Sequence, residues 1–279
     1  MRIRANAKIN LTLDITGKRA DGYHLLDSIM QSVDLCDIIT VQKNDNITVL
    51  CDNSDIIGED NICYKAAKKF FEATEICGGA AIEIEKHIPL AAGMGGGSAD
   101  AAAVICALDT IYDTDLTSDK LCEIALSVGA DVPFCVSGGT ARVEGIGEII
   151  NPLPLYNNGV FVIIKHGEKL STADMFKKID SMQCPLPKTP AAVAAIENGD
   201  FEEFYKNVKN DFALVAHDEV LLNDIKETTP KVASLSGSGP TVFAIYKNMC
   251  EARHAAEQLK QKGYDPIIAE PAERGIIFE

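Results

Sequence analysis

A cluster of glycines placed between a strand and a helix is the feature that most constrains this chain. Residues 81–85 alternate apolar and charged side chains, which is typical of a half-buried strand. Four glycines follow within Gly93–Gly97, and an alanine-rich stretch then predicts a helix to about Tyr112. Glycines let backbone N–H groups point inward, and a helix N-terminus adds partial positive charge. The sequence therefore predicts a phosphate-binding loop.

The loop matches neither of the two common nucleotide-binding motifs. Gly97 stands where the Walker A motif has its lysine, and Ser98 stands where the dinucleotide fingerprint has its third glycine. The alternative is a flexible connection that binds no ligand. We favour the phosphate site because a glycine cluster costs much backbone entropy on folding.

Two polar residues of the first predicted strand share one face. Residues 7–15 alternate strictly, so Lys8 and Asn10 project from the same side, about 7 Å apart along the strand. Asp131 follows a later predicted helix and precedes Pro133. Taken alone, Asp131 is better explained as a turn or cap residue. It becomes a candidate for catalysis only if a partner lies beside it.

The remaining patterns divide the chain into two halves at the proline-containing segment 151–154. In the first half, residues 23–26 begin a return strand. Further short strands are predicted at residues 37–41 and 46–50, and another through Val136. In the second half, strands alternate with helices in the order β-α-β-β-α-β, with extra helices inserted after the first, which is typical of a ferredoxin-like split β-α-β fold. Its strands are predicted at residues 160–164, 232–235, 241–246 and, as the final strand, 266–269.

A second glycine-rich segment, Ser236–Pro240, lies between two of these strands. It could be only a hairpin turn. In a chain that already has one phosphate loop, a second contact with phosphates is the more suggestive interpretation.

The net charge and the cysteine content indicate in which cellular compartment the protein acts and which classes of partner it can bind. The chain has 26 Lys and Arg against 41 Asp and Glu, a formal charge of −15, which should repel nucleic acid and anionic membranes. Its nine cysteines form no paired clusters, and its five histidines have no metal-ligand spacing. No apolar run has the length of a signal peptide or a membrane span. We expect a cytoplasmic protein without a metal site of its own, acting as a monomer or homodimer.

Three segments, in this order, resemble the motifs of the GHMP small-molecule kinases, and the resemblance spans essentially the whole chain. It implies an α+β fold of two domains with the active site between them. Residues 1–153 would form an N-terminal ribosomal-protein-S5-like β/α domain that binds ATP, and residues 154–279 a C-terminal ferredoxin-like domain. The segments that carry the resemblance are Ala7–Leu11 with Asp21–His24, Pro89–Ala103, and Leu235–Thr241.

The resemblance also implies roles for single residues. Lys8 and Asp131 match the catalytic pair, with Asp131 as the base for a substrate hydroxyl and Lys8 keeping its carboxylate ionised. ATP would bring Mg²⁺, held mainly by the nucleotide. The nucleotide loop would comprise Pro89, Leu90, Ala91, Ala92, Gly93, Met94, Gly95, Gly96, Gly97, Ser98 and Ala99. The substrate side would comprise Asn10, Tyr23, His24, Thr172, Phe176, Gly237, Ser238 and Gly239.

The first motif, Lys-x-Asn followed by Gly-Tyr-His, narrows the resemblance to kinases of isoprenoid biosynthesis that phosphorylate a tertiary hydroxyl of a cytidyl diphosphate alcohol. Tyr23 and His24 would suit a base that stacks. The alternatives are a mevalonate, homoserine or sugar kinase of the same superfamily, or a nucleotide-binding relative without activity. Relatives often have another residue at Gly95 and a serine at Ala99, so we expect these two positions to alter nucleotide affinity.

Overall fold

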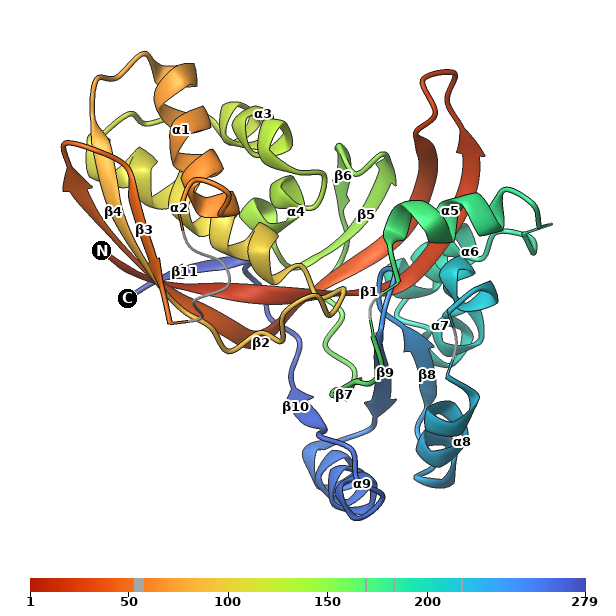
Figure 1. The fold of residues 1–279 in the computed structure, drawn as a ribbon. Helices are drawn as coiled ribbons and strands as arrows, with labels where there is room; N and C mark the ends of the chain where they lie inside the picture. Colours follow the sequence, from red (N-terminus) through yellow and green to blue (C-terminus); the bar gives the residue numbers. More distant parts are fainter. Residues whose placement is uncertain (53–57, 169, 183, 217) are drawn as a thin grey trace.

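The computed structural model describes residues 1–52, 58–168, 170–182, 184–216 and 218–279. Its longest feature is an antiparallel hairpin of β1 (Arg2–Lys18) and β2 (His24–Asn44), which crosses the molecule from the end that carries the termini to the helices of the second half (Figure 1). The hairpin therefore contributes to both halves of the fold, and the predicted active-site strand runs between them.

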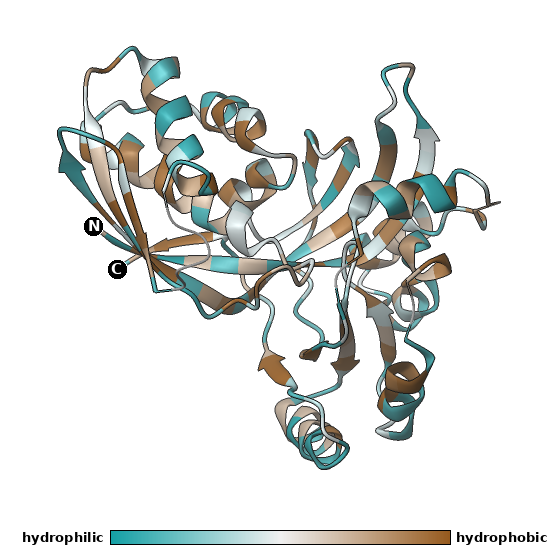
Figure 2. Ribbon diagram, in the orientation of Figure 1, coloured by the Kyte–Doolittle hydropathy of each residue, from teal (hydrophilic) through white to brown (hydrophobic). Residues whose placement is uncertain are grey.

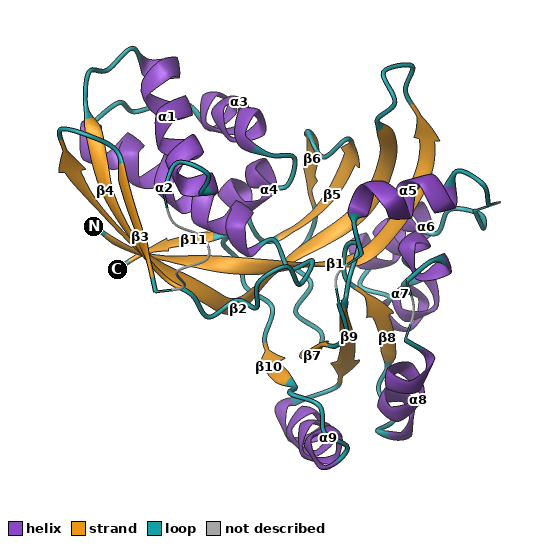
Figure 3. Ribbon diagram, viewed as in Figure 1, coloured by secondary structure: helices purple, strands orange, loops and turns teal. Residues whose placement is uncertain are grey.

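The first half is a large sheet covered on one face by helices (Figure 3). Along the sheet the order is β11-β1-β2-β4-β3, and β5 pairs with β2 and β6. The strands beyond the hairpin are β3 (Thr48–Cys51), β4 (Gly79–Glu85), β5 (Thr140–Gly145), β6 (Ile149–Pro152) and β11 (Ile276–Phe278). The covering helices are α1 (Ile62–Thr74), α2 (Gly96–Tyr112), α3 (Ser118–Val128) and α4 (Val132–Ser137).

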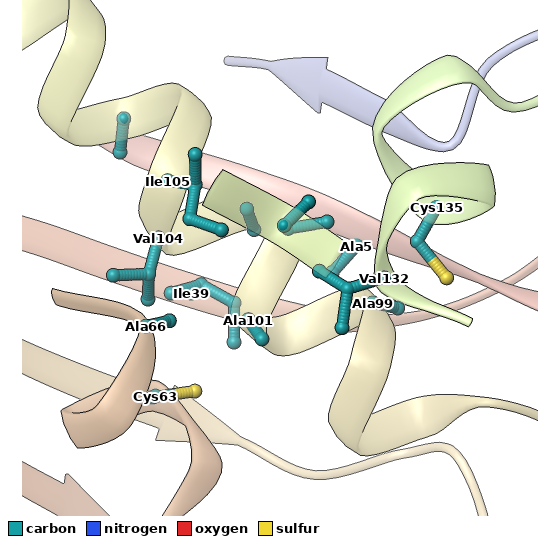
Figure 4. Close-up of a cluster of buried hydrophobic side chains, with 14 of the residues drawn as sticks. Ala5, Ile39, Cys63, Ala66, Ala99, Ala101, Val104, Ile105, Val132 and Cys135 are labelled. Atoms are coloured by element: carbon teal, nitrogen blue, oxygen red, sulfur yellow. The ribbon is translucent and has the colours of Figure 1, made fainter. Parts of the chain in front are cut away.

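Small side chains let α2 pack closely in the middle of this half. Ala99, Ala101 and Val104 are fully buried, and Figure 4 shows them among side chains of β1, β2, α1 and α4. The alanine-rich segment after the glycine cluster is thus a core helix, with its N-terminus fixed by packing rather than by propensity alone.

The second half has a four-stranded antiparallel sheet in the order β10-β7-β9-β8. Helices α8 and α9 pack on this sheet and carry both hydrophilic and hydrophobic segments (Figure 2), as expected for helices with one buried face. The strands are β7 (Val160–Lys165), β8 (Val232–Leu235), β9 (Thr241–Tyr246) and β10 (Ile267–Ala269). The helices are α5 (Thr172–Ile179), α6 (Thr189–Glu197), α7 (Phe201–Asn207), the 3-10 turn η2 (Asp211–Leu214), α8 (Glu219–Glu227) and α9 (Met249–Gln261). The predicted ferredoxin-like order is confirmed.

The structure corrects three predictions of elements in the first half. Residues 24–44 form one strand rather than several, because Ser28, Gln31 and other buried polar residues are hydrogen-bonded inside the fold and interrupt the apolar alternation. Residues 46–47 lie outside a strand, and β3 covers 48–51. Val136 lies in helix α4, which begins with a proline in its first turn.

A fourth correction concerns the end of the chain. The segment 266–269 is not the final strand, because β11 follows it and pairs with β1 in the first sheet. Residues 276–278 therefore join the first half, although the division at residues 153 and 154 assigned them to the second domain. With only three residues, β11 carries too little alternation to be recognised as a strand. None of the described helices is long and apolar enough to cross a bilayer.

Candidate active site

A cavity of about 500 Å³ lies where the two halves meet. Its walls come from β1, β2, the glycine loop, the start of α4, helix α5 and the turn between β8 and β9. Most of the residues predicted for the site line it, but Ala99 is buried in the core and Gly239 is buried within its turn, where its N–H donates to the Ser236 carbonyl. The predicted residues that do line it are Lys8, Asn10, Tyr23, His24, Pro89, Leu90, Ala91, Ala92, Gly93, Met94, Gly95, Gly96, Gly97, Ser98, Asp131, Thr172, Phe176, Gly237 and Ser238.

Lys8 and Asp131 form an ion pair in the wall of this cavity. The Lys8 Nζ atom lies 3.2 Å from Asp131 Oδ2 and donates a hydrogen bond of 2.7 Å to Asn10 Oδ1. The Lys8 side chain is 4% exposed, whereas that of Asp131 is 36% exposed. The ammonium is therefore held in place by two partners, and the carboxylate remains accessible to a molecule in the cavity. Lys8 is therefore the partner that Asp131 needed to become a candidate for catalysis.

The first strand holds the glycine loop directly. The backbone N–H of Lys8 donates to the carbonyl oxygen of Met94 at 2.9 Å, and the Asn10 side chain donates to Ser28 Oγ at 2.9 Å. The strand β1 pairs with β2 through shifted registers on both sides of Lys8–Asn10. These irregularities free the Lys8 N–H for the loop, so one strand positions both the ion pair and the predicted phosphate site.

Two glycines of the loop adopt backbone angles that other residues rarely take. Gly93 has φ = 76° and Gly95, which precedes α2, has φ = 69°. A Cβ atom on Gly95 would lie 2.8 Å from Lys8 Cγ, and one on Gly93 would lie 2.7 Å from the Ser236 carbonyl oxygen. Gly95 is therefore required for the close approach of the loop to Lys8 and does not simply add freedom.

The turn between β8 and β9 is both a hairpin and a wall of the cavity. Ser236 Oγ accepts a hydrogen bond from the Asn10 N–H at 3.2 Å and donates to the Gly93 carbonyl at 3.3 Å. Asn210 stabilises the turn by donating to the carbonyls of Leu235 (2.8 Å) and Gly237 (2.9 Å). The role of Asn210 was not predicted from the sequence, because a single asparagine before a short 3-10 turn is an ordinary cap.

Aromatic rings line the other end of the cavity. His24 and Phe176 stack with ring centroids 4.1 Å apart and an angle of 7° between the planes, and Phe212 meets Phe176 edge-on at 4.9 Å. Tyr23 is 61% exposed beside them. Thr172 is hydrogen-bonded to Ser238 at 2.9 Å. The cavity thus has one end lined by the glycine loop and the ion pair, and another that offers flat apolar surfaces.

A buried cluster of charged side chains beneath the glycine loop was not predicted from the sequence. Lys86, which lines the cavity, pairs with Asp37 and, at 2.7 Å, with Asp100. Asp37 also accepts the N–H groups of His87 (2.6 Å) and Ile88 (2.8 Å), which fixes the segment before the loop. Burial raises the pKa of Asp100 to about 8, against the opposing effect of the neighbouring Lys86. A lone charge among the alanines of α2 is the signal that could have revealed it.

The described residues contain no group of three or more His, Cys, Asp or Glu side chains that could hold a metal ion. The binding of magnesium mainly by a nucleotide stays a prediction.

Comparisons with known proteins agree in both sequence and structure. Family models for the GHMP kinases match twice, the N-terminal domain at residues 61–139 and the C-terminal domain at residues 192–265. A 4-diphosphocytidyl-2-C-methyl-D-erythritol kinase of Thermoanaerobacter pseudethanolicus is 40% identical over 268 residues, covering 94% of this chain and 92% of the relative. The kinase of the same name from Clostridium perfringens is 42% identical over 273 residues, covering 94% of each chain.

Solved structures give the same picture. A crystal structure of 4-(cytidine 5'-diphospho)-2C-methyl-D-erythritol kinase superposes with a TM-score of 0.78 at 29% identity, covering 98% of this chain and 99% of the other. A homoserine kinase from Cytophaga hutchinsonii superposes with a TM-score of 0.79 at 18% identity, covering 99% and 96%. At that identity the second likeness establishes the fold alone.

Proposed function

Because this chain belongs to the GHMP kinases and, within them, to the 4-diphosphocytidyl-2-C-methyl-D-erythritol kinases, we propose that it performs their reaction in the non-mevalonate route to isoprenoids. The γ-phosphoryl group of ATP passes to the tertiary 2-hydroxyl of 4-diphosphocytidyl-2-C-methyl-D-erythritol, giving the 2-phosphate and ADP. The observation that carries this proposal is the Lys8–Asp131 pair, placed in the wall of one cavity together with the glycine loop.

Asp131 acts as the base for the acceptor alcohol. Its carboxylate takes the hydroxyl proton while the alcohol oxygen forms a bond to the γ-phosphorus. The bond from that phosphorus to the β–γ bridging oxygen breaks, and ADP leaves. Lys8 stabilises the negative charge at this point, and Asn10 keeps the ammonium directed there through its 2.7 Å hydrogen bond.

The glycine loop binds the phosphates of ATP. Gly93 and Gly95 leave no room for side chains, so backbone N–H groups and the N-terminus of α2 can approach the phosphates closely. Phosphoryl transfer depends more on positioning and charge neutralisation than on covalent participation. The Mg²⁺ bound to ATP would add further neutralisation of the phosphate charge.

The aromatic end of the cavity binds the cytidyl group. Tyr23 and Phe176 offer faces for stacking, and His24 offers a ring nitrogen for a hydrogen bond. Thr172, Gly237 and Ser238 then lie between this end and the glycine loop, where the diphosphate of the substrate must pass.

Steady-state assays with ATP and Mg²⁺ test this proposal. The purified protein should phosphorylate the cytidyl alcohol, with ³¹P NMR showing a new phosphomonoester on the tertiary carbon. Mevalonate and homoserine, offered at the same concentration, should give no ADP above background. Phosphorylation of either one, with the cytidyl alcohol unchanged, would contradict the proposal.

We further propose a cytoplasmic enzyme that is a monomer or a homodimer. The described residues contain no disulfide, which suits a reducing compartment. Light scattering on the purified protein measures the oligomeric state, and a mass above that of a dimer would contradict the second part.

A further inference from the structure

One carboxylate connects helix α5 to the turn of the long hairpin. Asp180, directly after α5, accepts hydrogen bonds from Lys18 Nζ at 2.5 Å and from His24 Nε2 at 2.6 Å. Lys18 is the last residue of β1 and His24 is the first of β2. Figure 1 shows α5 lying beside this hairpin. None of the chemistry at Lys8 and Asp131 uses Asp180.

The His24 ring is held from two directions. Phe176 lies flat against its face, with 4.1 Å between the centroids, and the His24 side chain is only 9% exposed. Stacking alone would allow the ring to turn over, because both orientations present the same flat surface. The hydrogen bond to Asp180 distinguishes the two nitrogens, since only Nε2 reaches the carboxylate. The orientation of a ring that lines the cavity is therefore decided by Asp180.

The same contact decides where the imidazole carries its proton. The hydrogen bonds from His24 and Lys18 lower the pKa of Asp180, so its carboxylate stays ionised and can only accept. The shared hydrogen must then belong to Nε2. In a neutral imidazole the other nitrogen, Nδ1, is left as a hydrogen-bond acceptor.

We propose that Asp180 is a positioning residue that holds His24 with Nε2–H directed at its carboxylate, leaving Nδ1 as an acceptor for the base of the substrate. The proposal rests on the proposed function, because a base enters this end of the cavity only with the cytidyl alcohol. Cytosine carries an amino group, a donor, where uracil carries a carbonyl. An acceptor at Nδ1 therefore favours cytosine, and the opposite tautomer would favour uracil.

The variant Asp180→Asn tests this with little change of shape. An asparagine amide can donate to Nε2 and so hold the opposite tautomer, as happens when a catalytic aspartate beside a histidine is replaced by asparagine. Asp174→Asn is the matched control, because Asp174 lies on the same helix with an exposed side chain that pairs with Lys177 at 3.0 Å.

We expect Asp180→Asn to raise the KM for the cytidyl alcohol about tenfold and to lower the preference for the cytidyl over the uridyl substrate, in kcat/KM, by a similar factor. The kcat and the KM for ATP should stay within about twofold of wild type, and Asp174→Asn should change none of these values. If Asp180→Asn behaves as the control does, the role of Asp180 is refuted. A loss of kcat with unchanged KM would refute it equally.

A spectroscopic measurement separates this proposal from the proposed function. In ¹⁵N-histidine-labelled protein, with the signal assigned through His24→Gln, wild type should show a protonated Nε2 and an unprotonated Nδ1 at residue 24. Asp180→Asn should reverse or mix the two. A proton on Nδ1 in wild type, alone or together with one on Nε2, would overturn the proposal without any reference to turnover. An enzyme with the expected tautomer but no activity on the cytidyl alcohol would refute only the proposed function.

Discussion

At the scale of single residues, the site depends on contacts between side chains that are distant in sequence. Lys8 touches Asp131, and His24 touches both Phe176 and Asp180. The alternation of the first strand predicts that Lys8 and Asn10 share a face, which their direct hydrogen bond confirms. The contact between Lys8 and Asp131 could not be predicted from local sequence patterns, because the two residues are far apart in the chain. It was expected only from the resemblance to GHMP kinases.

The role of Asp131 can be tested by a nearly isosteric change. Asp131→Asn removes the proposed proton acceptor, so kcat should fall by a factor of about 10³. The dissociation constant for an ATP analogue, measured by calorimetry, should stay within about threefold, because in the proposed function the glycine loop binds the phosphates through its backbone. A variant that keeps near-wild-type kcat would remove Asp131 from the role of base. Asp174→Asn serves again as the control for a lost surface carboxylate.

At the scale of elements, the Lys86 cluster joins three pieces of the fold. Asp37 belongs to β2, Lys86 directly follows β4, and Asp100 lies in the first turns of α2. Together they fix the entry to the glycine loop from below. Sequence patterns identified the loop and the helix, yet they could not show that one lysine would bind two carboxylates from separate elements. The same holds for Asp180, whose partners belong to the opposite half of the molecule.

The raised pKa of Asp100 should make the stability of this cluster depend on pH. The folded-state pKa is raised to about 8 from an ordinary value of 3.8. Between these values the folded state keeps the proton that the unfolded state has released, so this contribution to the free energy of unfolding falls as pH rises. Relative to Asp100→Asn, which cannot titrate, wild type should lose about 1 kcal/mol per pH unit between pH 5 and pH 8.

Urea denaturation of both proteins at several pH values measures this difference. A constant difference across that range would show that Asp100 is ionised in the folded protein. A difference that grows in favour of wild type would contradict the direction of the shift.

At the scale of the whole molecule, the two halves are joined through more than the chain between them. The hairpin of β1 and β2 reaches into the second half, and β11 returns from the second half to pair with β1. The order of elements in the second half could be predicted, because β7 and β9 are nearly continuous apolar runs separated by helical segments. The return of β11 could not, because it depends on how closely its backbone fits against α4.

That fit predicts a strong effect of one methyl group. A Cβ atom on Gly275 would lie 1.9 Å from the carbonyl oxygen of Cys135, the last-but-two residue of α4. We expect Gly275→Ala to lower the free energy of unfolding by about 2–3 kcal/mol, because backbone must move to admit it. Gly17→Ala is the control, since its Cβ would meet only Leu25 Cδ1, at 3.8 Å. Chemical denaturation compares the two, and equal effects would show that β11 does not pack as described.

The position of β11 also has a consequence for the order of events at the ribosome. The strand that carries Lys8 is synthesised well before its neighbour on one side, because β11 is made only after the whole second half. Until then one edge of β1 has unpaired backbone groups, which is a state open to wrong partners. The pairing of β1 is therefore still incomplete when the first half has been synthesised. We expect the last step of folding to wait until residues 276–278 have left the exit tunnel.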